Sequence, residues 1–134
     1  MEPVSRHQRA IISQVWSLGR RRQWQEALAV FATVEEPHPR LRNAALDACT
    51  KSFESDAAQA VFDEMPQKTA PAYNSLIVMH GRMKRIREVE ALMKEMSDQD
   101  LKADATTFGT LITAYGMVHD VQAVLQILAD ALNA

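Results

Sequence analysis

The sequence has little cysteine, no long apolar run and few glycines, so it lacks the features that indicate a secreted, membrane or phosphate-binding protein. Its single cysteine, Cys49, cannot form a disulfide within the chain, and its place on an apolar helix side predicts a core thiol. No apolar run approaches the ~18 residues that cross a bilayer, so membrane insertion is not expected. The four glycines do not form a glycine-rich phosphate loop.

Catalytic and metal-binding patterns are also missing from the sequence. Its four histidines are far apart and belong to no HxxxH or CxxC motif. Asp98, Asp100 and Asp104 crowd one loop, but no base is paired with them. We therefore expect a protein that is not an enzyme, with no cofactor, no metal and no small-molecule substrate.

Helical periodicity dominates what is present, most clearly in residues 70–104. Apolar residues recur there at the spacing of one helix face, in two segments joined by a short loop, which predicts an antiparallel helical hairpin. Ser55 or Asp56 is expected to cap the second helix of a similar hairpin earlier in the chain. A hairpin with two apolar faces can bury only one against itself, so it needs copies on either side.

The copies appear when the stretch is shifted forward by 35 residues or back by 31. We interpret the chain as four repeats, 8–38, 39–69, 70–104 and 105–134, in one domain covering 1–134. The predicted fold class is all-α, an α-solenoid of four helix-turn-helix repeats with about eight helices. Three of the four glycines, Gly19, Gly81 and Gly116, share one register near the end of a first helix.

Charge is segregated between the two helices of each repeat, although the net charge is only −2. The first-helix segments with their turns hold ten Lys and Arg against three acidic residues, whereas the second-helix segments hold four against thirteen. Stacked hairpins place all first helices on one surface, so one face is expected to be basic and the opposite face acidic. The alternative is that acidic residues suit the second helices for local reasons.

The repeats resemble the pentatricopeptide repeat family. AYNSLI, GRMKRIREVEALMKEM and LKAD are similar to its 35-residue form, and NAALDAC with AQAVFDEMPQK to its 31-residue form. The related tetratricopeptide repeat requires a small residue where this chain has Val15, Leu46, Ile77 and Ile112. The resemblance covers residues 8–134 and implies a right-handed solenoid that binds single-stranded RNA in mitochondria or chloroplasts, for RNA processing, stability or translation.

By this resemblance, the fifth and last residues of a repeat read one base. Asn74 with Asp104 matches the combination associated with uracil, and Asn43 with Thr69 suggests a pyrimidine more weakly. Ile12, paired with His38, and Gly109 depart from the pattern. The second residue of each repeat would flank the bases, and these residues are Arg9, Arg40, Pro71 and Thr106.

Arg20, Lys51 and Arg82 share the register of the family's phosphate-contacting basic residue, and Met117 breaks the series. Three such contacts predict a salt slope of only about −2 on single-stranded RNA, so four repeats alone should bind weakly. Only seven residues precede the first repeat, too few for a targeting peptide.

A protein-interaction scaffold is the alternative function, for example a small subunit of a larger organellar assembly such as a ribosome or membrane complex. Two departures from the base-reading pattern and the apolar segment LQILADALNA favour it. Further repeats or a protein partner are expected to cover that apolar segment.

Overall fold

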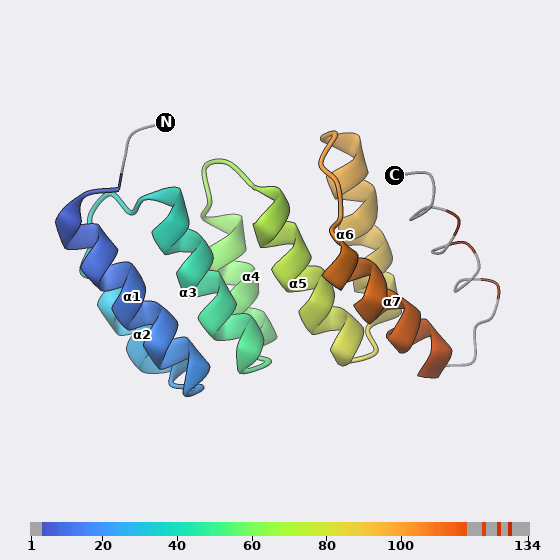
Figure 1. Cartoon of the computed structure of the whole chain (residues 1–134), viewed down its shortest axis with the longest axis horizontal. Coiled ribbons are helices and arrows are strands. Elements are labelled where there is room, and N and C mark those ends of the chain that lie inside the picture. The colour runs from blue at the N-terminus through green and yellow to red at the C-terminus, as the bar shows by residue number, and fades with distance from the viewer. Residues whose placement is uncertain (1–3, 118–121, 123–125, 127–128, 130–134) are drawn as a thin grey trace. The chain divides into compact units, whose positions relative to one another are not determined.

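The computed structural model describes residues 4–117 together with 122, 126 and 129, and the described residues form seven helices and no strand (Figure 1). The helices are α1 (Arg6–Arg20), α2 (Trp24–Phe31), α3 (Pro39–Lys51), α4 (Ser55–Asp63), α5 (Ala70–Arg82), α6 (Ile86–Asp98) and α7 (Ala105–Met117). The predicted all-α class is confirmed. The second helix expected for repeat 105–134 lies outside the described residues, apart from residues 122, 126 and 129.

The repeat boundaries predicted from sequence coincide with helix starts. The helices α3, α5 and α7 begin at Pro39, Ala70 and Ala105, the first residues of the second, third and fourth repeats, and α1 begins two residues before the first repeat. Contacts divide the chain into two compact units, Met1–Lys68 and Thr69–Ala134, and the boundary falls one residue before the end of predicted repeat 39–69. The single-domain organisation stays a prediction, and each unit is described by itself.

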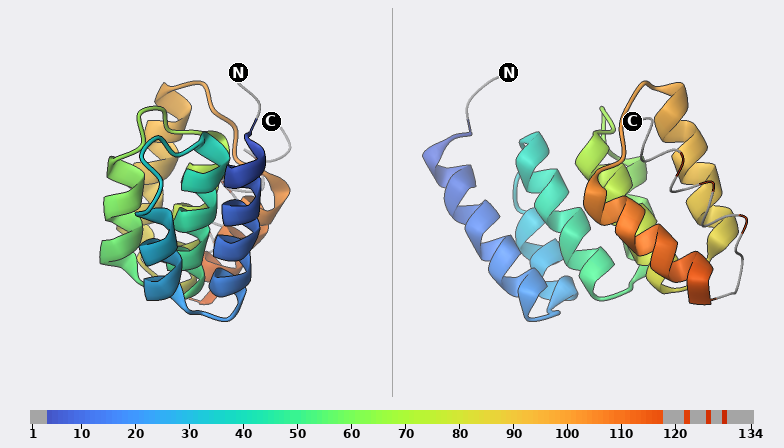
Figure 2. Two further views of the ribbon diagram at one scale, coloured as in Figure 1. Left: turned by 90° about the vertical axis from the view of Figure 1, so that its left-hand side faces the viewer. Right: turned by 45° about the vertical axis from the view of Figure 1, so that its right-hand side comes forward.

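In the first unit, α1 packs against α2 and α3, and α3 packs against α4. The first helices α1 and α3 form one layer and the second helices α2 and α4 the other (Figure 2). Val15, Ala27 and Leu41 are fully buried between them. Near their carboxyl ends α1 and α3 approach closely, since a Cβ added to Gly19 would lie 3.0 Å from the Ala48 Cα.

In the second unit, α5 packs against both α6 and α7. Tyr73 is fully buried, and its hydroxyl accepts a hydrogen bond from Gln99 Nε2 at 2.7 Å and lies 3.5 Å from Glu95 Oε2. Burial is the main cause that raises the pKa of Tyr73. The phenol therefore stays neutral and anchors α5 to the end of α6.

The turn between the two helices of each described hairpin has one geometry. Arg22, Phe53 and Lys84 occupy the same register and adopt positive φ values of 60°, 56° and 61°. Each donates its N–H to the carbonyl three residues earlier, and the next N–H reaches the carbonyl five residues earlier, which is the Schellman motif. None of these left-handed positions is a glycine, although glycine is the residue that the motif usually takes.

The helix boundaries show where the shared glycines lie and whether Ser55 or Asp56 caps α4. Gly19 and Gly81 are buried penultimate residues of α1 and α5, so the shared glycine register lies inside the helix and not in the turn. The expectation that Ser55 or Asp56 caps α4 is wrong, because α4 begins at Ser55 and its N-cap, Glu54, makes no side-chain hydrogen bond. The left-handed residue leads the chain directly into the second helix.

Replacing Lys84 with glycine is expected to raise the free energy of unfolding by roughly 0.5–1 kcal/mol, because glycine adopts the left-handed conformation without steric cost. Lys94→Gly, in the interior of α6, is the matched control and should lower it by about 1 kcal/mol. Urea denaturation followed by circular dichroism measures both changes. A lower midpoint for Lys84→Gly would contradict the strain argument.

Candidate nucleic-acid interface

The last residue of each of the first three repeats caps the first helix of the next repeat. His38 Nδ1 accepts from the Arg40 N–H at 3.1 Å, and Thr69 Oγ1 accepts from the Ala72 N–H at 3.4 Å. Asp104 Oδ1 accepts from the Thr107 N–H at 2.8 Å. These residues, predicted from the resemblance to contact a base, therefore also satisfy backbone donors that the start of a helix leaves unpaired.

The structure brings Asn74 and Asp104 together through a third side chain, Thr107. The Thr107 hydroxyl oxygen lies 2.7 Å from Asn74 Oδ1 and 2.9 Å from Asp104 Oδ1. Thr107 is fully buried, whereas Asn74 is half-buried and Asp104 is exposed. The threonine of repeat four thus joins the two predicted base-reading residues of repeat three.

Sequence reasoning missed Thr107. A hydroxyl carries one proton, so it donates to only one of its two oxygen neighbours at a time. The available signal was the spacing Asp-x-x-Thr at a helix start, which places Thr107 where it can meet the capping carboxylate. The same register in repeats two and three holds Leu41 and Ala72, which carry no hydroxyl.

The other predicted base-reading positions differ from this one. Asn43 lies half-buried on α3 of the first unit, and Thr69 belongs to the second unit. Ile12 is only 7% exposed and belongs to the core of the first unit, so it can present no group to a ligand. Gly109 lies on α7, and no atom of the described residues lies within 4 Å of where its Cβ would be.

The predicted phosphate-contacting residues share one helix position. Arg20, Lys51 and Arg82 are the last residues of α1, α3 and α5, each eight residues after the fifth position of its repeat, which is about 12 Å along a helix. Arg20 and Arg82 are exposed and make no ion pair with any described residue. Lys51 differs, because its Nζ lies 2.8 Å from Asp47 Oδ2 on the same helix.

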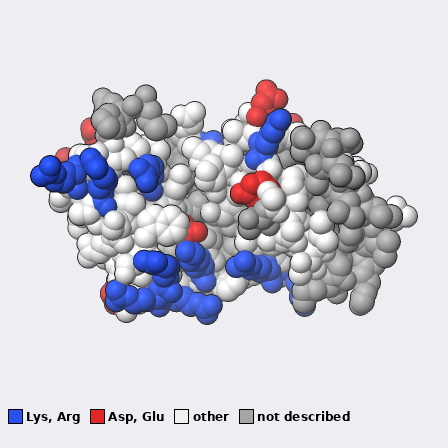
Figure 3. All heavy atoms as spheres, viewed as in Figure 1, with Lys and Arg blue, Asp and Glu red and all other residues white. Residues whose placement is uncertain are grey.

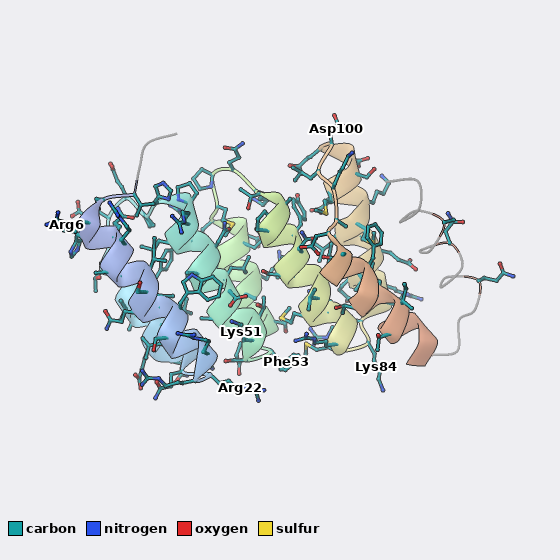
Figure 4. The ribbon with its side chains drawn as sticks, viewed as in Figure 1. Arg6, Arg22, Lys51, Phe53, Lys84 and Asp100 are labelled. Carbon is teal, nitrogen blue, oxygen red and sulfur yellow. The ribbon has the colours of Figure 1, made fainter. Side chains whose placement is uncertain are left out.

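Positive side chains gather at the carboxyl ends of the first helices in the first unit, seen at the lower left of Figure 3. Figure 4 labels Arg22 and Lys51 there, and Arg20 and Arg21 are the last residue and the C-cap of α1. Cations are favoured at this end of a helix by its dipole. In the second layer, α2 and α4 contain acidic residues and no Lys or Arg, so the predicted segregation of charge is present in this unit.

The predicted base-flanking residues are placed as follows. Arg9 and Arg40 are exposed on α1 and α3 of the first unit. Pro71 is exposed in the first turn of α5. The side chain of Thr106 lies outside the described residues.

The described residues also bear on catalysis and the membrane. Among them, no three His, Cys, Asp or Glu side chains are grouped so that they could hold a metal ion, and no helix is long and apolar enough to span a bilayer.

Burial, with a smaller contribution from Glu54, raises the pKa of the buried Cys49 thiol to about 11. Cys49 is therefore the protonated core thiol that the sequence predicted.

Tandem helical hairpins whose first helices end in basic residues define a helical-repeat protein. A profile described as the PPR repeat family matches residues 68–117, and one described as the PPR repeat matches residues 42–69. The chain belongs to the pentatricopeptide repeat family.

The names of the relatives assign some to mitochondria and others to chloroplasts. A mitochondrial pentatricopeptide repeat-containing protein of Arabidopsis thaliana is 30% identical over 88% of this chain and 24% of its own length. A chloroplastic one from the same organism is 28% identical over 59% of this chain and 10% of its own length.

A solved structure shows the same fold. The crystal structure of the pentatricopeptide repeat protein PPR10 from maize is similar over 92% of this chain and 19% of its own, with a TM-score of 0.68 and 26% identity. This likeness confirms the α-solenoid fold class. The chain spans a quarter or less of the length of all three relatives.

Proposed function

We propose that this chain binds single-stranded RNA along its first helices, with Asn74 and Asp104 recognising uracil. The observation that carries the proposal is the group formed by Asn74, Thr107 and Asp104 on α5 and at the start of α7. Family membership supports RNA as the ligand, and the names of the relatives support an organelle as the location, in RNA processing, stability or translation.

The orientation of the Asn74 amide follows from the single proton that the Thr107 hydroxyl can donate. A carboxylate accepts hydrogen bonds more strongly than a neutral amide, so the single Thr107 proton favours Asp104. The structure has Asn74 Oδ1 nearest the threonine oxygen. Because the oxygen and nitrogen positions of an amide are assigned from such networks, we infer the amide turned by about 180°, with its NH₂ group donating to the threonine oxygen. Its carbonyl oxygen is left to accept the N3–H of uracil, whereas N3 of cytosine has no proton to donate.

Arg82 and its counterparts supply the sequence-independent part of the binding. Each phosphate contact on a single strand contributes about 0.7 to the slope of log affinity against log salt concentration. Arg20 and Arg82 are ready for this contact, whereas Lys51 must first leave Asp47. The pairing of Lys51 therefore adds to the weakness of binding that three contacts already predict.

The test compares two charge reversals in the second unit. Arg82→Glu should weaken binding to oligouridine at low salt by about tenfold and reduce the salt slope by about 0.7. Arg87→Glu makes the same charge change at an exposed site of α6 and should leave both nearly unchanged. Fluorescence anisotropy at several salt concentrations measures both quantities. Equal effects of the two variants would contradict binding along the first helices.

A protein-interaction scaffold is the second candidate function. It is favoured by the burial of Ile12, which leaves the fifth position of repeat one with no polar group to read a base. Partners captured from organelle extract that remain after nuclease treatment would support it. Loss of every partner on nuclease treatment would support RNA binding.

A further inference from the structure

The first repeat exposes an aromatic ring one turn beyond its buried fifth position. Ile12, Trp16 and Arg20 follow one another at four-residue spacing, so they lie along one side of α1. Trp16 is 39% exposed, and Phe53 is the only other large apolar side chain exposed among the described residues. An indole left in water at this place needs an explanation, because burying it would stabilise the fold.

A lysine from the neighbouring first helix covers the ring. Lys51 Nζ lies 4.8 Å from the centre of the Trp16 ring, and the same ammonium group pairs with Asp47 at 2.8 Å. The contact with the ring is of the kind that contributes little at partly exposed sites. Lys51 is partly exposed, whereas Asp47 Oδ2 is buried, so a phosphate that draws the ammonium group away must also compensate for the carboxylate oxygen left unpaired.

We propose that Trp16 is a stacking platform for an unpaired RNA base, and that Lys51 moves from Asp47 to the phosphate of the bound strand. This inference rests on the proposed RNA-binding function. It assigns to repeat one a contact that Ile12 cannot make, since Ile12 is buried and has no hydrogen-bonding group. Every base has a π face, so this contact tolerates any sequence.

The ring also differs in kind from the base-reading group of repeat three. There a hydrogen-bonding edge selects the base, whereas here the ring would hold the strand without selecting it. Purines should bind somewhat more tightly than pyrimidines, because two fused rings overlap the indole more fully.

The intrinsic fluorescence of Trp16 provides a direct test. The chain has two tryptophans, and Trp24→Phe leaves Trp16 as the only indole. Titration of this variant with oligoadenosine should quench the fluorescence, because a stacked base lies against the excited ring. An oligonucleotide of equal length made of abasic sites keeps the phosphates and should bind without this quenching.

Substitutions at Trp16 give an independent measurement. Trp16→Leu keeps an apolar side chain but removes the π face, and should weaken oligoadenosine binding by about tenfold. Trp16→Phe keeps an aromatic ring and should lose much less. Circular dichroism and thermal melting check that each variant remains folded, and the exposure of Trp16 makes both changes compatible with folding.

The possible outcomes separate this inference from the proposed function. If the chain binds RNA but the abasic strand quenches as strongly as oligoadenosine, or Trp16→Leu binds as tightly as Trp16→Phe, the platform is excluded and RNA binding stands. If the unaltered chain binds no oligonucleotide at low salt, both proposals fall.

Discussion

Replacing Gly19 with leucine is expected to lower the free energy of unfolding by about 3 kcal/mol, the upper part of the range for overpacked cores. The cause is the contact between α1 and α3. A Cβ on Gly19 would lie 3.0 Å from the Cα and 3.1 Å from the Cβ of Ala48, and a leucine adds three more carbons beyond that atom. The neighbour is backbone, which cannot rotate away as a flexible side chain can.

Gly109→Leu is the matched control for this change. Gly109 also lies within a first helix, α7, but nothing occupies the space where its Cβ would be. There the helix gains from losing a glycine, and stability should rise by up to about 1 kcal/mol. Chemical denaturation followed at 222 nm gives both values. Similar destabilisation of the two variants would show that close approach at Ala48 is not the cause.

Removing the hydroxyl of Thr107 should reduce the preference for uracil over cytosine by about tenfold, since one oriented hydrogen bond is worth roughly 1–2 kcal/mol. Valine has nearly the shape of threonine and keeps the buried methyl group. Without the hydroxyl, the Asn74 amide can turn either edge to the ligand. Competition between oligouridine and oligocytidine measures the ratio of the two affinities.

Two controls make this result specific. Thr107→Ser keeps the hydroxyl and should keep the uracil preference. Thr113→Val removes another hydroxyl from α7, one that donates to the Gly109 carbonyl at 3.1 Å, and should also leave the preference unchanged. A purely structural role of Thr107 would weaken binding to both strands equally, and an unchanged ratio would therefore refute its role in positioning Asn74.

The repeat framework could be predicted because it depends on local patterns. The repeats chosen from apolar spacing and self-similarity begin at the same residues as α3, α5 and α7. For Ile12, the residue type alone predicted a side chain that forms no hydrogen bond. Its burial could not be predicted, because it depends on how the helices of the first unit pack.

The remaining features could not be predicted because they depend on contacts between helices or on strained backbone. The link from Asn74 to Thr107 joins residues 33 positions apart, and the contact of Lys51 with Trp16 joins α3 to α1. The left-handed turn positions could not be predicted either. They are occupied by arginine, phenylalanine and lysine, and none of these residue types favours that conformation.

The helix-capping role of the residue that ends a repeat, together with the base contact proposed for it, limits which residues can replace it. Asp, Asn, Ser and Thr all cap helices well, and replacing one of them with a non-capping residue costs about 1 kcal/mol. A protein of many repeats that changed this residue freely would lose stability with every change. Under the proposed function, base recognition at this position is thus limited to residues that can also cap a helix, which are mainly Asp, Asn, Ser and Thr and, in repeat one, His38.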